Sequence, residues 1–582
     1  MPAAFATSKI PLLAVTETDN GTLTGSMAYA SLDIKPGEGR VFIDSFPLTK
    51  LDTQISTRFA KEIACSYLDI DCSKKDFFYV IRASSSIVGG PSAGGALAIL
   101  TIAELQGLPI PQNVAMTGTI NSGFLIGPVG GLKEKITIAG KSNMTRVIIP
   151  ATTKIQKTED NKTLDLVEYG NNLSMSIIEA ANLDEATAQF FGKQLRNKTY
   201  NFTLEESYVN VMKDLAKELC NYSDTLLVNL LDYTLRQSKP FTNESRILEY
   251  NAFELRDKAV EPAKSGKYYA SASYCYGANV KYRQAFNLQL NYTKEEIQDL
   301  REKFEKSLDD FEKNFNSKKQ ETITDLQTYI IVNDRIDEAR GNVEVANEFL
   351  GENKTKEASL ILATAVERLN SAKSWSRFFG TGTKKLVLDK EALKEVCLEK
   401  VSEAQERQQY VAMYFPKNAA QISDDVEIAQ ELFNKEKFEL CIEKASTAKA
   451  DADVILSSLS VEKENLGFLV KQKLAAAQES IARQNAKGMF PIMGYSYYEL
   501  ASNLQKEDEV SALIYSEYAL ELSSLDMYFK TKESVSDVNK RVIISNRELI
   551  YLGLGLILGL LIAELYYTIR KISLKKKIIR KK

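Results

Sequence analysis

The chain has no histidine in 582 residues. Its absence excludes Ser-His-Asp triads, Cys-His pairs and every histidine-ligated metal site. The six cysteines contain no Cys-x-x-Cys pair, so a zinc site is not expected either. The sequence also lacks a GxxxxGK[ST] phosphate-binding loop. A serine nucleophile here would need another base, and a desolvated lysine is the main remaining candidate.

Composition is that of a folded protein, with 44% hydrophobic and 26% charged residues. At this length more than one domain is expected, because single cores rarely exceed about 250–300 residues. The net charge is −3, but residues 570–582 are strongly basic, so the rest of the chain is acidic. A mildly acidic body argues against a nucleic-acid partner.

Residues Leu549–Ile569 form an almost unbroken apolar run of the length that a bilayer core requires. Tyr566 and Tyr567 lie at its end, where an aromatic belt is found, and the basic tail follows. This pattern predicts one transmembrane helix. The alternative is a buried core helix, which would not normally be followed by a basic tail and the chain end.

The basic tail predicts a cytoplasmic C-terminus and an extracytoplasmic body, that is, a single-pass protein of the cell membrane. The first residues do not form a signal peptide, so we expect one to have been removed or to lie upstream. Recurrent Asn-x-Ser/Thr sequons agree with an outside location. The even number of cysteines permits three disulfides, although the sequence leaves their pairing open.

Two textures divide the body of the chain. Before about Lys193, short β-type runs alternate with helical segments, which predicts an α/β domain. From about Thr203 helical periodicity dominates and glycine is sparse. The predicted strands are 9–16, 25–33, 77–83 and 146–149, and the predicted helices of the first part are 53–68 and 92–105.

Three segments of the helical part resemble one another, beginning at Val343, Val426 and Tyr497. Each predicts a helix–turn–helix with a shared alanine near its start. The pattern resembles a weak, irregular tetratricopeptide-type repeat. An ordinary helical bundle, whose hairpins share an apolar pattern, is an equal alternative.

Ser92 lies within Gly89–Gly95, a glycine-rich segment that leads into an apolar helix. At a helix N-terminus, free N–H groups stabilise negative charge, and glycines let a substrate carbonyl approach closely. Taken alone, a helix N-cap is the more common role for such a serine.

A nearby lysine that could act as a base would favour the nucleophile role of Ser92 over the N-cap role. It must be neutral to accept a proton, so burial must lower its pKa by several units. Lys133 and Lys135 follow an apolar, glycine-rich stretch that could bury one of them, and the residues alone do not choose between the two. Thr117 lies between the serine and lysine motifs and could hydrogen-bond the ammonium.

The segments GGPSAGGALA, AMTGTI, GPVGGLKEKITIAGK and RVIIP, in this order, closely resemble the proteolytic domain of Lon (S16) proteases over roughly 9–191. The resemblance implies that Ser92 is the nucleophile, Lys135 the general base and Thr117 a supporting hydroxyl, with Gly90, Pro91 and Ala93 shaping the site. It also implies peptide-bond cleavage through an acyl-enzyme, no cofactor or metal, and assembly into homo-oligomeric rings, often of six subunits.

The chain departs from that family in three respects. It shows no AAA+ ATPase ahead of the proteolytic domain, which implies ATP-independent action on unfolded or loosely folded polypeptides. Two positions that are often acidic in the family are Gly89 and Thr119 here. A helical ectodomain and a membrane anchor replace the usual partners, an arrangement similar to isolated Lon-like proteins of archaeal type.

The sequence therefore predicts a membrane-anchored extracytoplasmic serine endopeptidase with a Ser-Lys dyad. Two alternatives remain open: a catalytically silent surface scaffold that uses its helical hairpins, and a domain that cleaves only its own chain. The predicted parts are a Lon-type α/β protease domain over 1–195, a helical-hairpin ectodomain of possible repeat type over 196–546, a transmembrane helix over 547–569 and a basic cytoplasmic tail over 570–582.

Overall fold

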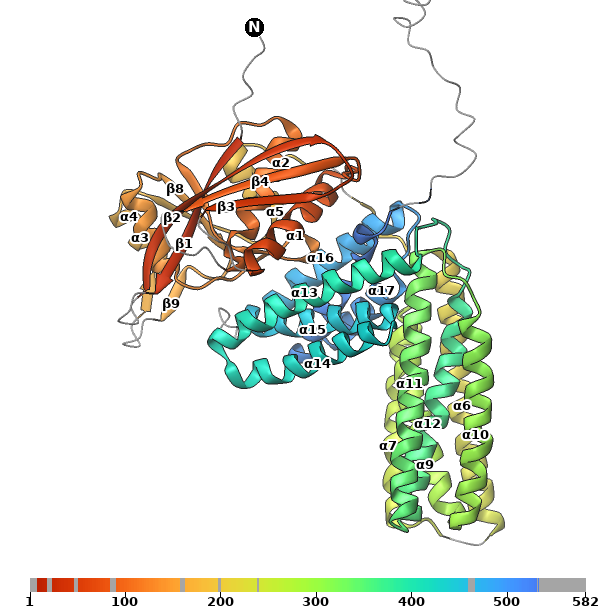
Figure 1. Cartoon of the computed structure of the whole chain (residues 1–582). Coiled ribbons are helices and arrows are strands. Elements are labelled where there is room, and N and C mark those ends of the chain that lie inside the picture. Colours follow the sequence, from red (N-terminus) through yellow and green to blue (C-terminus); the bar gives the residue numbers. More distant parts are fainter. Residues whose placement is uncertain are drawn as a thin grey trace, which may run out of the picture. The chain divides into compact units, whose positions relative to one another are not determined.

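The computed structural model describes residues 8–17, 23–46, 51–83, 90–157, 163–196, 200–237, 240–458, 466–530 and 532. The first part of this chain is an α/β domain and the second is all helical, as the sequence predicts (Figure 1). The described residues up to 530 form one compact unit.

The α/β domain is built on a seven-stranded mixed sheet. Its central strands β1 and β2 are antiparallel and joined by a short connection, whereas β5, β8 and β11 continue the sheet in parallel on one side. All four predicted strands are present. In sheet order the strands are β11 (Ser176–Ala180), β8 (Arg146–Pro150), β5 (Val114–Met116), β1 (Ser8–Glu17), β2 (Leu23–Pro36), β4 (Lys75–Ala83) and β3 (Val41–Phe46).

Helices cover both faces of this sheet. Because successive side chains of a strand point to opposite faces, Leu12 and Leu13 of β1 enter two different hydrophobic cores. One core contains α1 (Leu51–Leu68), α2 (Gly94–Gln106) and α5 (Leu183–Phe191). The other contains α3 (Leu132–Lys141) and α4 (Leu166–Asn172).

Short elements connect these layers. They are the 3₁₀ turns η1 (Pro91–Ala93) and η2 (Ser122–Phe124) and the strands β6 (Thr119–Ile120), β7 (Ile126–Gly127), β9 (Ile155–Lys157) and β10 (Thr163–Asp165). The hairpin of β6 and β7 directly follows β5, so it extends from the edge of the sheet where parallel strands end.

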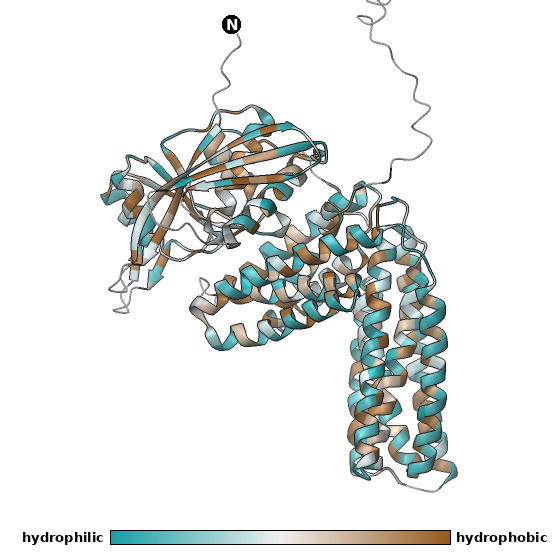
Figure 2. Cartoon of the chain, in the orientation of Figure 1, coloured by the Kyte–Doolittle hydropathy of each residue, from teal (hydrophilic) through white to brown (hydrophobic). Residues whose placement is uncertain are grey.

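The helical part begins with α6, and hydrophilic and hydrophobic residues alternate along its helices (Figure 2). Packing of the apolar faces builds a large shared core, which stabilises helices that are too polar to persist alone. The helices are α6 (Glu206–Arg236), α7 (Asn243–Lys258), α8 (Val260–Lys264), α9 (Tyr268–Leu290), α10 (Lys294–Asn316), α11 (Ile323–Gly351), α12 (Thr355–Trp375), α13 (Lys390–Tyr414), α14 (Pro416–Asn434), α15 (Phe438–Ser458), α16 (Leu466–Ala486), α17 (Ile492–Leu504) and α18 (Glu509–Leu522), followed by the turn η5 (Leu525–Tyr528).

The three predicted helix–turn–helix segments are the hairpins α11–α12, α14–α15 and α17–α18. Their shared alanines, Ala346, Ala429 and Ala501, are all buried. The sequence similarity of the three segments therefore includes a small apolar side chain at a buried position. The elongated bundle that contains α6, α7 and α9–α12 departs from a regular stack of hairpins (Figure 1).

Three disulfides join cysteines that are neighbours along the sequence, Cys65 with Cys72, Cys220 with Cys275 and Cys397 with Cys441. The second connects α6 to α9, and the third connects α13 to α15. No described cysteine is free. The pairing that the sequence left open is therefore resolved.

The predicted transmembrane helix and the single-pass membrane location require correction. Among the described residues, no helix is both long enough and apolar enough to cross a bilayer. The two longest, α6 and α11, have the length, but charged side chains occur along both of them. The predicted span 547–569 and the tail 570–582 lie outside the described residues.

The other predicted boundaries stay predictions. The division at 195/196 falls between α5 and α6, but the two sides belong to one compact unit. The end of the helical region at 546 lies beyond the last described residue.

Candidate functional site

Ser92 lies in η1, between the end of β4 and the start of α2. The turn begins at Gly90, whose φ of 103° belongs to backbone that residues with a Cβ rarely adopt. Pro91 is buried, and its ring fixes its own φ. Ser92 and Ala93 are only half-buried. The glycine-proline pair therefore sets the position of a serine that remains partly accessible.

The structure separates Ser92 from the role of a helix cap. The N-cap position of α2 is Ala93, and that of η1 is Gly90, and neither end has a side-chain cap. The hydroxyl of Ser92 is thus not used to close the helix N-terminus. Gly89, one of the two positions that depart from the family, lies outside the described residues.

Lys135 lies in the first turn of α3 and is almost completely buried, with 2% of its surface exposed. Burial lowers the pKa of its ammonium from 10.5 to about 7, because a charged amine loses its hydration there. Lys133 is two residues away on the same helix and is exposed. Of the two candidate lysines, the one at 135 therefore has the environment that a neutral amine needs.

Thr117 connects the lysine to the serine segment. The Lys135 Nζ atom donates to Thr117 Oγ1 at 3.1 Å, and this hydroxyl donates in turn to the Ser92 carbonyl at 3.3 Å. The neighbouring Gly118 N–H donates to the same carbonyl at 2.9 Å. The structure thus brings the three residues together through the Ser92 backbone and the Thr117 side chain.

Glycines make this approach possible. A Cβ at Gly95 would lie 2.6 Å from the Met116 side chain, and the Gly95 N–H donates to the Gly118 carbonyl at 2.9 Å. At the start of α3, Gly131 has a φ of 66°, and a Cβ there would lie 2.6 Å from Val15. The segments that carry Ser92 and Thr117 therefore pack closely through their backbones, and the start of the Lys135 helix packs against β1.

Residues of the helical part contact two of these segments, and no sequence pattern indicated these residues. Arg407 of α13 donates to the Ile120 carbonyl, and Tyr410 accepts from the Gly130 N–H. Ser122 donates to Glu521 of α18 at 2.7 Å. These partners are about 280 to 400 residues apart along the chain, so no local pattern could have indicated them.

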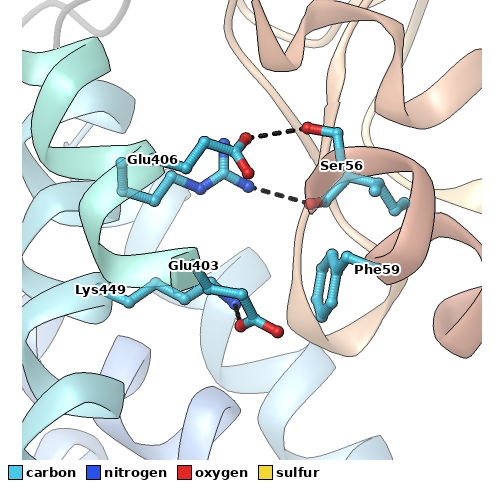
Figure 3. Close-up of a pocket in the computed structure, with 7 residues that line it drawn as sticks. Ser56, Phe59, Glu403, Glu406 and Lys449 are labelled. Carbon is cyan, nitrogen blue, oxygen red and sulfur yellow. Dashed lines mark hydrogen bonds and ion pairs between the residues drawn. The ribbon is translucent and has the colours of Figure 1, made fainter. Parts of the chain in front are cut away.

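A small pocket lies where α1 faces α13 (Figure 3). Ser56 of α1 donates to Glu406 of α13 at 2.9 Å, and Phe59, Glu403 and Lys449 line the space beside this bond. Within the described part of the chain, no group of three or more acidic or cysteine side chains has the arrangement of a metal site.

Comparison with known proteins assigns a family to this segment. Residues 69–186 match the C-terminal proteolytic domain of Lon protease (S16). The chain is 30% identical over 187 residues to a Lon protease of Methanosphaera stadtmanae, covering 31% of this chain and 22% of that protein. It is 26% identical over 182 residues to a Lon protease of Bacillus thuringiensis, covering 29% and 22%. It thus spans less than a quarter of the length of these curated relatives.

Proposed function

We propose, from the Lon-type proteolytic domain within residues 69–186, that the chain is a serine endopeptidase with a Ser92–Lys135 dyad. The observation that carries the proposal is the burial of Lys135, which brings the pKa of a lysine to about 7. A group that titrates near neutral pH can both accept and return a proton during a reaction. Its link to Ser92 through Thr117 supports the same assignment.

In the first half of the reaction, Ser92 Oγ attacks the peptide carbonyl carbon while neutral Lys135 takes the hydroxyl proton. A C–O bond forms, and the carbonyl oxygen becomes an oxyanion. When the C–N bond breaks, Lys135 returns the proton to the leaving amine, and an acyl-enzyme remains. Water then attacks the acyl carbon by the same route and releases the second product, which regenerates Ser92.

The N-terminus of α2 lies near Ser92, where its dipole would stabilise the negative charge of the oxyanion. The helix begins at Gly94, two residues after Ser92, and its dipole favours negative charge near the nucleophile. The N–H groups of Gly94 and Gly95 already donate to the Pro91 and Gly118 carbonyls, so this stabilisation comes from the dipole and not from these two donors. Gly94 and Gly95 keep side chains away from this end of the helix.

Substrate class and assembly follow from the family as parts of the same proposal. Without a GxxxxGK[ST] loop in the sequence, we infer action that does not depend on ATP. Unfolded or loosely folded polypeptides are then the substrates, since no nucleotide-driven step would open a stable fold. Homo-oligomeric assembly, as in rings, is part of the proposal and is tested by mass measurement in solution.

Covalent labelling tests the nucleophile directly. A fluorophosphonate should modify Ser92, as read by peptide mass spectrometry, because the probe needs an activated hydroxyl. Lys135→Met should abolish the labelling at pH 8, whereas Lys133→Met should retain it. Equal labelling of Ser92 in the Lys135→Met protein would contradict the role given to this lysine.

A further inference from the structure

Helix α13 contacts both of the segments that hold the proposed dyad together. Arg407 and Tyr410 are three residues apart, so they lie on one face of this helix. Arg407 is 4% exposed and Tyr410 is 7% exposed, which makes this face an internal one. The two side chains end on different active-site segments.

Arg407 holds the segment that follows Thr117. Its Nη2 donates to the Ile120 carbonyl at 3.1 Å and to Asn121 Oδ1 at 2.7 Å, while its Nε pairs with Asp453 of α15 at 3.1 Å. Ile120 is three residues beyond Thr117, and β6 joins them. A guanidinium donates in a rigid planar fork, so these bonds fix both the distance and the angle of the loop.

Tyr410 holds the segment that precedes Lys135. The Gly130 N–H donates to the Tyr410 hydroxyl at 3.0 Å. Gly130 is followed by Gly131, the N-cap of α3, and the Lys135 N–H donates to the Gly131 carbonyl. One hydroxyl of the helical part therefore acts on the first turn of the helix that carries Lys135.

The helical part also binds the loop after Thr117 through Ser122, and a cluster of buried charges fixes the helices that make this contact. Ser122 donates to Glu521, which pairs with Lys400 of α13 at 3.2 Å and Lys449 of α15 at 2.7 Å. Burial raises the pKa of Glu521, but the two ammonium groups outweigh this effect and lower the pKa to about 2. Buried charges are strongly destabilising unless they stay paired, so α13, α15 and α18 keep a fixed relation to the loop.

We propose that α13 is a positioning element for the dyad: Arg407 and Tyr410 hold the Thr117 and Lys135 segments in register, so the helical part sets the activity of Ser92. This inference rests on the proposed function. Neither residue touches the reacting atoms. Their contribution is to hold Lys135 and the Ser92 turn at the separation that proton transfer requires, where a misplacement of about 1 Å costs on the order of a hundredfold in rate.

The test is Tyr410→Phe in the full-length chain, measured on a fluorogenic peptide. The variant removes one oxygen and leaves the Gly130 N–H without this acceptor. We expect kcat to fall roughly ten- to a hundredfold with little change in KM. We also expect the midpoint of the pH–rate profile to rise, because a looser α3 admits water to Lys135.

A matched control separates positioning from stability. Tyr518→Phe removes a comparable hydroxyl, which donates to Asp451 at 2.8 Å within the helical part. It should leave kcat and the pH midpoint unchanged. Arg407→Lys provides a second test, because it keeps the charge beside Asp453 but loses the planar fork, and it should lower kcat in the same way.

The outcomes distinguish this inference from the proposed function. If Tyr410→Phe and Arg407→Lys keep the kcat and pH midpoint of the native chain while Ser92→Ala is inactive, the positioning role of α13 is wrong and the dyad stands. If both variants lose activity only in proportion to a loss of folded protein, as followed by circular dichroism, the role is structural and the inference fails. If Ser92→Ala retains activity, both proposals fall.

Discussion

Lys135 Nζ lies 3.1 Å from Thr117 Oγ1 inside the α/β domain, and this hydroxyl contacts the backbone of Ser92. A hydroxyl can accept a hydrogen bond from a neutral amine as well as from an ammonium, so it does not fix the charge of the lysine. Burial alone lowers the pKa of Lys135, with no opposing carboxylate among the causes. The hydrogen bond thus positions Lys135 without favouring its protonated form.

The pH dependence of peptide hydrolysis should report Lys135. The reaction needs the neutral amine, so kcat/KM should rise with pH through about 7 and then level off. An ordinary exposed lysine would give a midpoint near 10.4 instead. Initial rates on a fluorogenic peptide between pH 5 and 10 measure this. A profile that is flat from pH 5 to 9 would refute the assignment.

Lys135→Met should abolish hydrolysis and stabilise the fold. The pKa of Lys135 is about 7 in the folded chain and 10.5 as the ordinary value, so the unfolded chain binds the proton more tightly. Stability of the native protein therefore falls as pH drops from about 10.5 to 7, and the penalty is complete below 7. At about 1.4 kcal/mol per pKa unit, the variant should gain roughly 1–4 kcal/mol at pH 6.

Urea unfolding at pH 6 and pH 10.5 checks this prediction. The stabilisation by Lys135→Met should shrink at the higher pH, where Lys135 is neutral in the folded chain and only half-protonated in the unfolded chain. Lys133→Met is the control, since Lys133 is exposed and should change stability little at either pH. An equal gain for both variants would show that burial of the charge at position 135 is not the cause.

Gly90→Ala should lower activity through the backbone. The φ of 103° strains any residue with a Cβ, although a Cβ would meet no atom within 4 Å there. We expect a cost of about 1–3 kcal/mol, which the turn can relieve by displacing Ser92. Gly107→Ala, at a φ of 62° after α2, should cost stability without the large loss of kcat. Equal kcat values in the two variants would contradict the role of Gly90.

Removal of the Cys397–Cys441 disulfide should destabilise the chain more than removal of Cys65–Cys72. The two bridges close segments of 44 and 7 residues, so chain entropy predicts losses of about 4 and about 2 kcal/mol. Double substitution to alanine at each pair, followed by thermal unfolding, measures the difference. Because the Cys397–Cys441 bridge joins α13 to α15, its loss should also reduce kcat. The reverse order of stabilities would contradict the entropic argument.

Local sequence patterns predicted most of the elements. Short runs of β-type residues indicated β1, β2, β4 and β8, because β-branched and aromatic side chains favour extended backbone. The helix expected from Ser92 begins two residues later, at Gly94, since the Gly90–Pro91 pair first forms a 3₁₀ turn. The three helical hairpins were predictable because each repeats a similar apolar pattern that includes a buried alanine.

The site was predictable in part. The residues alone left Lys133 and Lys135 undecided, since a burial difference between neighbours depends on how α3 packs against the sheet. The roles of Arg407 and Tyr410 were beyond any sequence pattern, because they act on segments about 280 residues away. The membrane helix predicted from the apolar run at 549–569 is not supported, because no described helix is long and apolar enough to cross a bilayer, and the run itself lies outside the described residues.

The most direct test of the account is hydrolysis of casein by the full-length chain without ATP, beside Ser92→Ala, Lys135→Ala and Lys133→Ala. We expect cleavage by the native protein and by Lys133→Ala. In Ser92→Ala and Lys135→Ala we expect the rate to fall by at least a thousandfold, on the order found when one member of a catalytic pair is removed. Cleavage that persists in Ser92→Ala, or no cleavage by the folded native chain, would contradict it.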